Sequence, residues 1–240
     1  ISKSLHAQGI DHERKPRPRQ WVIAEAGPEH VESIEAVFGP KRDDTPVLGR
    51  AMHLMGRLAQ ATKHSKGRPS AALDAMHPVA QLQCAMAGKG RLWCSNLSSI
   101  FAYSCNHYGI LCRTVSCGNA KTLAGQAVTF GNGHMTTEVY APETRQWVWM
   151  DILLGISCAL LCGEVALSFF EFVNYFNSSY KDKLTVTTPV DGAGTHRAVA
   201  LHDFPHLDSL KRYFNGNQMY SYTVQTPYTD KIVGLLAEES

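Results

Sequence analysis

The chain has 240 residues, of which 44% are hydrophobic and 18% are charged, and its formal net charge is +2. This length and composition suffice for one substantial core, so we expect one elaborated domain over residues 21–240. The balanced charge gives no strong field, which argues against nucleic acid or an anionic membrane as a partner.

The first 20 residues are expected to form a disordered or loosely attached basic arm, because residues 14–19 alternate basic side chains with proline. The chain begins at Ile1 and not at methionine, so the sequence leaves open whether a signal or anchor segment precedes it. The folded part is predicted to begin within residues 21–38.

Two helices are predicted before residue 90. Thr45 resembles an N-cap and Pro46 a first helical residue, and Pro78 begins the second helix. The apolar faces are formed by Leu48, Met52, Met55, Leu58 and Ala59 in the first helix and by Val79, Leu82 and Met86 in the second. We expect both to cover the helix that follows.

The next predicted helix begins at Cys94 and ends at Gly109, because apolar residues recur at helical spacing between them. Its first turn presents unpaired N–H groups and the positive end of the helix dipole, which favour a nucleophilic thiolate without a metal. The other six cysteines match no zinc-binding spacing, so no metal or other cofactor is expected. They are interpreted mostly as small buried hydrophobic residues, while their pairing in an oxidising compartment stays open.

A β-hairpin is predicted from residues 134–140 and 146–152, with 141–144 as the turn. If Tyr140 lies opposite Arg145, then His134 lies opposite Asp151, and opposed residues share a face of the sheet. Asp151 is then expected to orient the imidazole while its other nitrogen faces the sulfur. A slip of one residue would move Asp151 to the other face.

Four blocks of the sequence resemble the transglutaminase-like superfamily of papain-like cysteine enzymes. The blocks are Gly90 to Cys94, Gly109 to Val115, His134 followed by 138–140, and Trp147 to Asp151. The resemblance implies an α+β fold in which the nucleophile helix packs on an antiparallel sheet. It places the core at about residues 45–155, with a C-terminal α/β elaboration over 156–240.

The same resemblance implies a catalytic triad of Cys94, His134 and Asp151. Three residues, instead of one, separate Gly90 from Cys94, so the oxyanion donors are expected to differ from those of many relatives. Trp93 is predicted to form a wall of the substrate site.

The implied reaction is acyl transfer from a protein or peptide amide through a thioester at Cys94. Transfer to water would make the enzyme a peptidase, amidase or deamidase, and transfer to an amine would make it a transglutaminase or amide synthase. We favour hydrolysis, because water needs no second binding site. A non-catalytic binding module on the same fold is the alternative from another class.

Each of these residues also has a purely structural interpretation. Cys94 could be a core residue, His134 could cap the turn before it, and Asp151 could end a strand. Arg113 is predicted to form a structural ion pair, and Glu138 and Tyr140 are predicted to face outward.

The apolar run at residues 152–162 is too short for a membrane-spanning helix, which needs about 20 residues, because Glu164 interrupts it. It is predicted to be buried core that leads into a helix ending near Asn177. Beyond it we expect a strand at 184–188, a turn at 192–194, a helix at 205–214 and a strand at 219–224. This last third lies outside the resemblance and is a candidate region for substrate specificity or a partner site.

Overall fold

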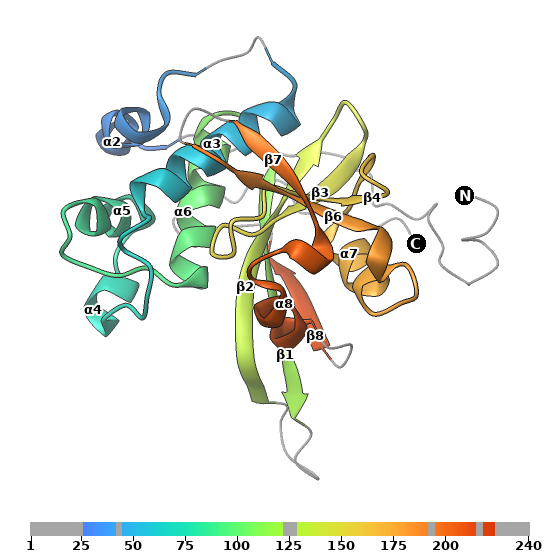
Figure 1. Cartoon of the computed structure of the whole chain (residues 1–240). Coiled ribbons are helices and arrows are strands. Elements are labelled where there is room, and N and C mark those ends of the chain that lie inside the picture. Colours follow the sequence, from blue (N-terminus) through green and yellow to red (C-terminus); the bar gives the residue numbers. More distant parts are fainter. Residues whose placement is uncertain (1–25, 42–44, 122–128, 192–194, 215–217, 224–240) are drawn as a thin grey trace, which may run out of the picture.

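The structure, a computed structural model, describes residues 26–41, 45–121, 129–191, 195–214 and 218–223. The predicted basic arm and the turn at 192–194 lie outside the described residues. The described residues form a mixed α+β arrangement with two antiparallel sheets, which agrees with the predicted α+β class (Figure 1).

Five helices precede the first strand in the described part of the chain. They are α2 (Pro28–Phe38), α3 (Val47–Ala61), α4 (Ala71–Asp74), α5 (Pro78–Met86) and α6 (Cys94–His107). Both predicted early helices are therefore present as α3 and α5. The predicted cap of α3 is wrong by one residue: Pro46 occupies the N-cap position, and the Leu48 N–H donates to Glu143 Oε1 at 2.8 Å. Helix α6 begins as predicted and stops before Gly109, which adopts φ 71°.

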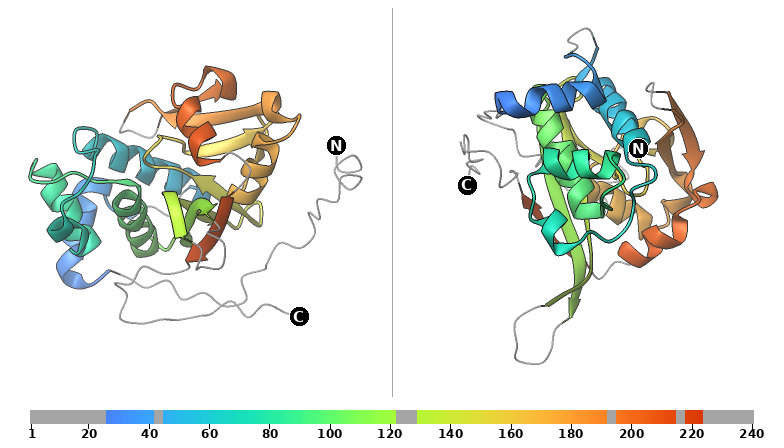
Figure 2. Two further views of the ribbon diagram at one scale, coloured as in Figure 1. Left: turned by 90° about the horizontal axis from the view of Figure 1, so that it is seen from below. Right: turned by 90° about the vertical axis from the view of Figure 1, so that its left-hand side faces the viewer.

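The first sheet has the strand order β3-β2-β1-β8. Its strands are β1 (Cys112–Lys121), β2 (Thr129–Ala141), β3 (Gln146–Met150) and β8 (Gln218–Thr223). Helices α2 to α6 gather on one side of this sheet, and α6 packs against β1 and β2 (Figures 1 and 2). The predicted packing of the Cys94 helix on an antiparallel sheet is confirmed.

The second sheet has the order β5-β4-β6-β7 and lies on the other side of the first, together with α7 and α8 (Figure 2). Its strands are β4 (Cys158–Leu161), β5 (Val165–Ala166), β6 (Leu184–Pro189) and β7 (His196–Ala200). The remaining elements are α7 (Phe169–Phe176), η1 (Lys181–Lys183), η2 (Leu201–Asp203) and α8 (Leu207–Tyr213). The predicted helix 205–214 and strand 184–188 are thus confirmed.

The apolar run at 152–162 is largely buried, as predicted, and it ends in β4. The helix that follows begins only at Phe169, because Ser168 and Glu171 form a capping box there. It ends at Phe176, with Asn177 as its C-cap, as predicted. None of the described helices combines the length and the apolar composition that crossing a membrane would require.

The predicted outward position of Glu138 is wrong, because its side chain is fully buried. Its Oε2 pairs with the Arg113 guanidinium at 2.6 Å, and its Oε1 accepts the Phe169 N–H at 2.6 Å. Burial raises the pKa of Glu138, and Arg113 and the Phe169 N–H oppose that rise. The second sheet and α7 cover this face of the hairpin, so both of its faces are buried. The alternation of polar and apolar residues along the strand therefore did not predict the burial of Glu138. The predicted ion pair of Arg113 is confirmed.

Candidate active site

Cys94 is the first residue of α6 and is partly exposed. Asn96, two residues later, holds the chain at this point, because its Oδ1 accepts the Trp93 N–H at 2.9 Å. The Asn96 amide then donates to Asp74 Oδ1 at 2.8 Å and to Gln81 Oε1 at 3.0 Å. The start of α6 is therefore fixed to α4 and α5 by a partly buried polar network.

The backbone N–H groups of Cys94 and Ser95 lie in the first turn, where α-helical N–H groups have no partner within the helix. The Trp93 N–H, by contrast, already donates to Asn96 Oδ1. The Trp93 side chain is 44% exposed, so it stands at the surface beside Cys94 instead of packing into the core.

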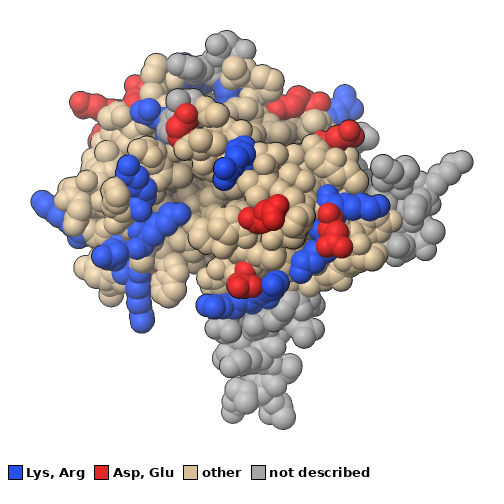
Figure 3. Space-filling model, viewed as in Figure 1, with Lys and Arg blue, Asp and Glu red and all other residues tan. Residues whose placement is uncertain are grey.

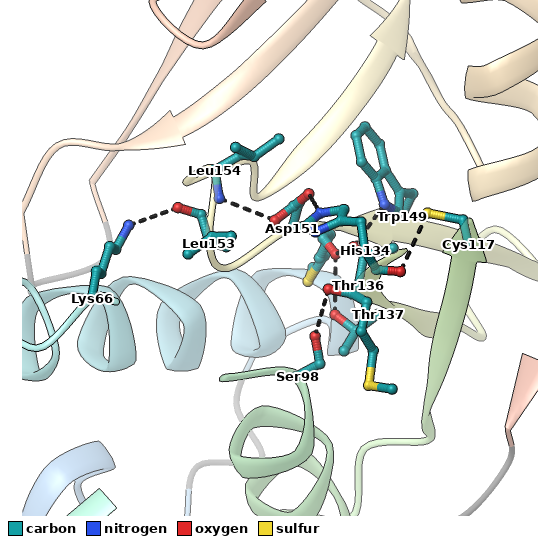
Figure 4. Close-up of polar contacts among 12 residues, drawn as sticks. Lys66, Ser98, Cys117, His134, Thr136, Thr137, Trp149, Asp151, Leu153 and Leu154 are labelled. Atoms are coloured by element: carbon teal, nitrogen blue, oxygen red, sulfur yellow. Dashed lines mark hydrogen bonds and ion pairs between the residues drawn. The ribbon is translucent and has the colours of Figure 1, made fainter. Parts of the chain in front are cut away.

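His134 and Asp151 meet in the interior, as Figure 4 shows. The imidazole Nε2 donates to Asp151 Oδ2 at 2.6 Å, and neither side chain is exposed to solvent. Because an ionised carboxylate only accepts hydrogen bonds, this contact places a proton on Nε2 and leaves Nδ1 for another partner. The contact expected from the hairpin is present.

The pairing from which that contact was predicted is wrong by two residues. Tyr140 lies opposite Trp147, and the last pair joins Thr137 with Met150. The loop occupies 142–145 because Arg145 adopts φ 54° and belongs to the turn. A shift of two residues preserves the face of the sheet, so His134 and Asp151 still lie on the same side.

Asp151 itself lies just after β3, in a tight loop whose backbone is paired on both sides. Its N–H and C=O exchange hydrogen bonds with Ile156 at 2.7 and 2.8 Å. The second carboxylate oxygen, Oδ1, accepts the Leu154 N–H at 3.0 Å, and Lys66 Nζ donates to the Leu153 carbonyl at 2.8 Å (Figure 4). Both carboxylate oxygens therefore have fixed directions before any substrate binds.

The electrostatic environment of His134 favours the protonated imidazole. Burial alone lowers the pKa of His134, but the charge and hydrogen bond of Asp151, with a contribution from Cys94, raise it to about 10. Nδ1 is buried and makes no hydrogen bond of normal geometry with the described residues, although Cys94 lies close enough to affect the pKa. Nδ1 is therefore the ring nitrogen that is left for an interaction with Cys94, as the triad hypothesis requires.

Helix α8 covers the imidazole, a feature that sequence reasoning missed. The Tyr213 ring stacks on His134 with centroids 4.3 Å apart and planes 11° from parallel, and Phe214 meets the ring edge at 6.1 Å. Burial raises the pKa of Tyr213, and Cys94 and Asp151 raise it further, which places this side chain within the electrostatic range of both groups. No local pattern predicts the stacking, because α8 is about 80 residues from His134 along the chain.

All seven cysteines lie among the described residues and none forms a disulfide. Cys94 differs from most of them by its exposure, since Cys105, Cys112, Cys117 and Cys158 are buried. Burial raises the pKa of Cys117 and of Cys158 to about 12, which makes both thiols poor nucleophiles at neutral pH.

No protein-family model and no curated protein matches this chain. The family resemblance therefore depends on the four blocks of sequence alone. The functional proposal depends on the arrangement of Cys94, His134 and Asp151.

Proposed function

We propose that the chain is a transglutaminase-like cysteine enzyme with a papain-like core, and that it transfers the acyl group of a protein or peptide amide through a thioester at Cys94. One observation carries this proposal: Asp151 holds the buried His134 ring through Nε2, which leaves the buried Nδ1 for the thiol at the start of α6. This is the arrangement of nucleophile, base and orienting group that activates a thiol.

The reaction begins with Cys94 and His134 as a thiolate and an imidazolium, a state that the raised pKa of His134 favours. The sulfur attacks the amide carbonyl carbon, and the N–H groups of Cys94 and Ser95 stabilise the oxyanion. His134 then gives its proton to the departing nitrogen, which leaves as ammonia or an amine, and a thioester remains. Asp151 retains its charge and holds the ring in place throughout.

Water is the proposed acceptor of the acyl group. The imidazole, neutral after the first step, takes a proton from water as it attacks the thioester, and the sulfur leaves as the thiolate. The products are a free acid and the regenerated enzyme, so the activity is that of a peptidase, amidase or deamidase.

The proposed activity is tested with a library of glutamine-containing peptides and a labelled primary amine. We expect cleaved or deamidated peptide in excess of amine adduct, and no product from the Cys94→Ala variant. An excess of amine adduct would make the enzyme a transferase. If neither product forms across the library, the non-catalytic binding module is favoured.

A further inference from the structure

Positive charge is concentrated in the segments that lead to the nucleophile. Residues 62–93 contain one acidic residue, Asp74, and five basic residues, which are Lys63, Lys66, Arg68, Lys89 and Arg91. Those segments therefore carry a formal charge of +4, whereas the whole chain carries +2. We refer to the five basic residues as the basic rim.

The structure brings the two halves of the basic rim together beside Cys94. The backbone of Lys66 is bridged to Leu92, and the Gly67 N–H donates to the Leu92 carbonyl at 3.0 Å. Arg91 Nη1 donates to the Lys66 carbonyl at 3.2 Å. The loop of residues 63–68 thus runs along the chain that enters α6, two residues before the nucleophile.

The same loop also contacts the other side of the site. Lys66 Nζ reaches the Leu153 carbonyl, and the Asp151 carboxylate acts on its pKa, which burial lowers and Asp151 raises. Lys63, Arg68, Lys89 and Arg91 are exposed. The Asp74 carboxylate accepts a hydrogen bond from Asn96. Figure 3 shows Lys and Arg side chains gathered on the part of the surface formed around α4 and α5.

We propose that the basic rim binds carboxylates of the substrate, so that the preferred acyl donor is an acidic peptide segment with Asp or Glu near the reacting amide. This inference rests on the proposed function. A peptide is favoured over RNA because the positive charge adjoins a thiol that acts on amides, and the chain as a whole is nearly neutral. Aspartate or glutamate side chains near the amide would be attracted within a Debye length of about 10 Å at 0.1 M salt.

The field at Cys94 is measured with two alkylating reagents of similar size, neutral iodoacetamide and anionic iodoacetate. Peptide mapping gives the rate of each at Cys94, and the iodoacetate-to-iodoacetamide ratio reports the local potential. The variants are Arg68→Glu and the double variant Lys63→Glu/Arg68→Glu. The matched control for Arg68→Glu is Arg197→Glu, which makes the same change of charge at an exposed arginine on β7 of the second sheet.

In low salt we expect the double variant to lower that ratio by about 3- to 10-fold. The logarithm of the ratio should fall about half as far in Arg68→Glu, because one basic residue is replaced instead of two. Arg197→Glu should leave the ratio unchanged. High salt should abolish the difference between the rim variants and wild type, because salt screens exposed charges. The imidazolium of His134 is common to all four proteins, so it does not contribute to that difference. An unchanged ratio in the double variant, with fast labelling by iodoacetamide, would overturn the basic-rim inference and leave the proposed function intact. If Cys94 reacts no faster with iodoacetamide than an ordinary thiol, the proposed function fails, and this inference fails with it.

A peptide experiment then identifies the bound class. Glutamine peptides with flanking glutamates should show a lower KM than the same peptides with flanking lysines, and the double variant should reverse the order. Equal KM values for the two peptides would contradict the inference. Tight, salt-dependent binding of a single-stranded RNA that protects Cys94 from iodoacetate would also contradict it, because the basic rim would then serve a nucleic acid.

Discussion

Replacing Asp151 with asparagine isolates the role of the carboxylate with almost no change of shape. In the wild type, Asp151 accepts from His134 Nε2 and from the Leu154 N–H. Asparagine has one acceptor oxygen, and the Leu154 N–H requires it. The new amide nitrogen then faces His134 Nε2, which must accept and therefore lose its proton to Nδ1.

The expected size of the effect of Asp151→Asn follows from the pKa of His134. The difference between about 10 and the ordinary value of 6.5 corresponds to about 5 kcal/mol of preference for the imidazolium. Without the carboxylate, burial lowers the pKa of His134 and only Cys94 opposes it, so the ring loses most of its preference for the imidazolium. A thiol without a cationic partner has a pKa of about 8.5 and is about 0.3% thiolate at pH 6.

The assay is the rate of iodoacetamide labelling at Cys94 as a function of pH. We expect Asp151→Asn to lower the rate near pH 6 by roughly 30- to 100-fold and to shift the profile toward that of an ordinary thiol. The loss of amide turnover should be smaller than that in Cys94→Ala or His134→Ala, because Asp151 orients and does not react. A variant that keeps the wild-type rate near pH 6 while its His134 ring is neutral by NMR would refute this account of the site.

Three further predictions concern stability and the covering helix. Cys94→Ala should leave the thermal midpoint within about 1 °C of wild type, whereas Cys105→Ala, on the buried face of the same helix, should lose about 1 kcal/mol and about 2–4 °C; unfolding of Cys94→Ala would instead favour a structural cysteine. Tyr213→Ala should slow labelling of Cys94 near pH 6 several-fold and Tyr213→Phe should not, because phenylalanine keeps the ring stacked on His134; equal rates in both variants would show that the stacked ring has no effect on the site. Because the pKa of His134 is raised, its contribution to the free energy of unfolding should be fully present below about pH 6.5 and be lost as the pH rises toward about 10; urea titrations of wild type and His134→Ala across that range should converge, and a constant difference would contradict the shift.

Local patterns sufficed to predict the elements that carry the site. The periodicity after Cys94 and the stop at Gly109 placed α6, and alternation with turn residues placed β2 and β3. Even the hairpin register, although wrong by two residues, put His134 and Asp151 on one face, because an even shift does not change the face.

Contacts between distant parts of the chain could not be predicted from the sequence, for a physical reason. Glu138 reads as an exposed strand position, and only the layer formed by α7 and the second sheet buries it. Tyr213 covers His134, and β8 adds an edge strand beside β1, from parts of the chain about 80 to 110 residues away. Such pairings leave no periodic trace in either segment, so they require the folded structure.

The central claim is the thioester at Cys94, and its direct measurement is the mass of the acid-quenched enzyme after brief incubation with acidic glutamine peptides. The account predicts a mass increase equal to the peptide minus ammonia or minus its leaving fragment. The adduct should map to Cys94, be released by hydroxylamine and be absent in Cys94→Ala. Formation of product by Cys94→Ala, or an adduct at another residue, would contradict the claim.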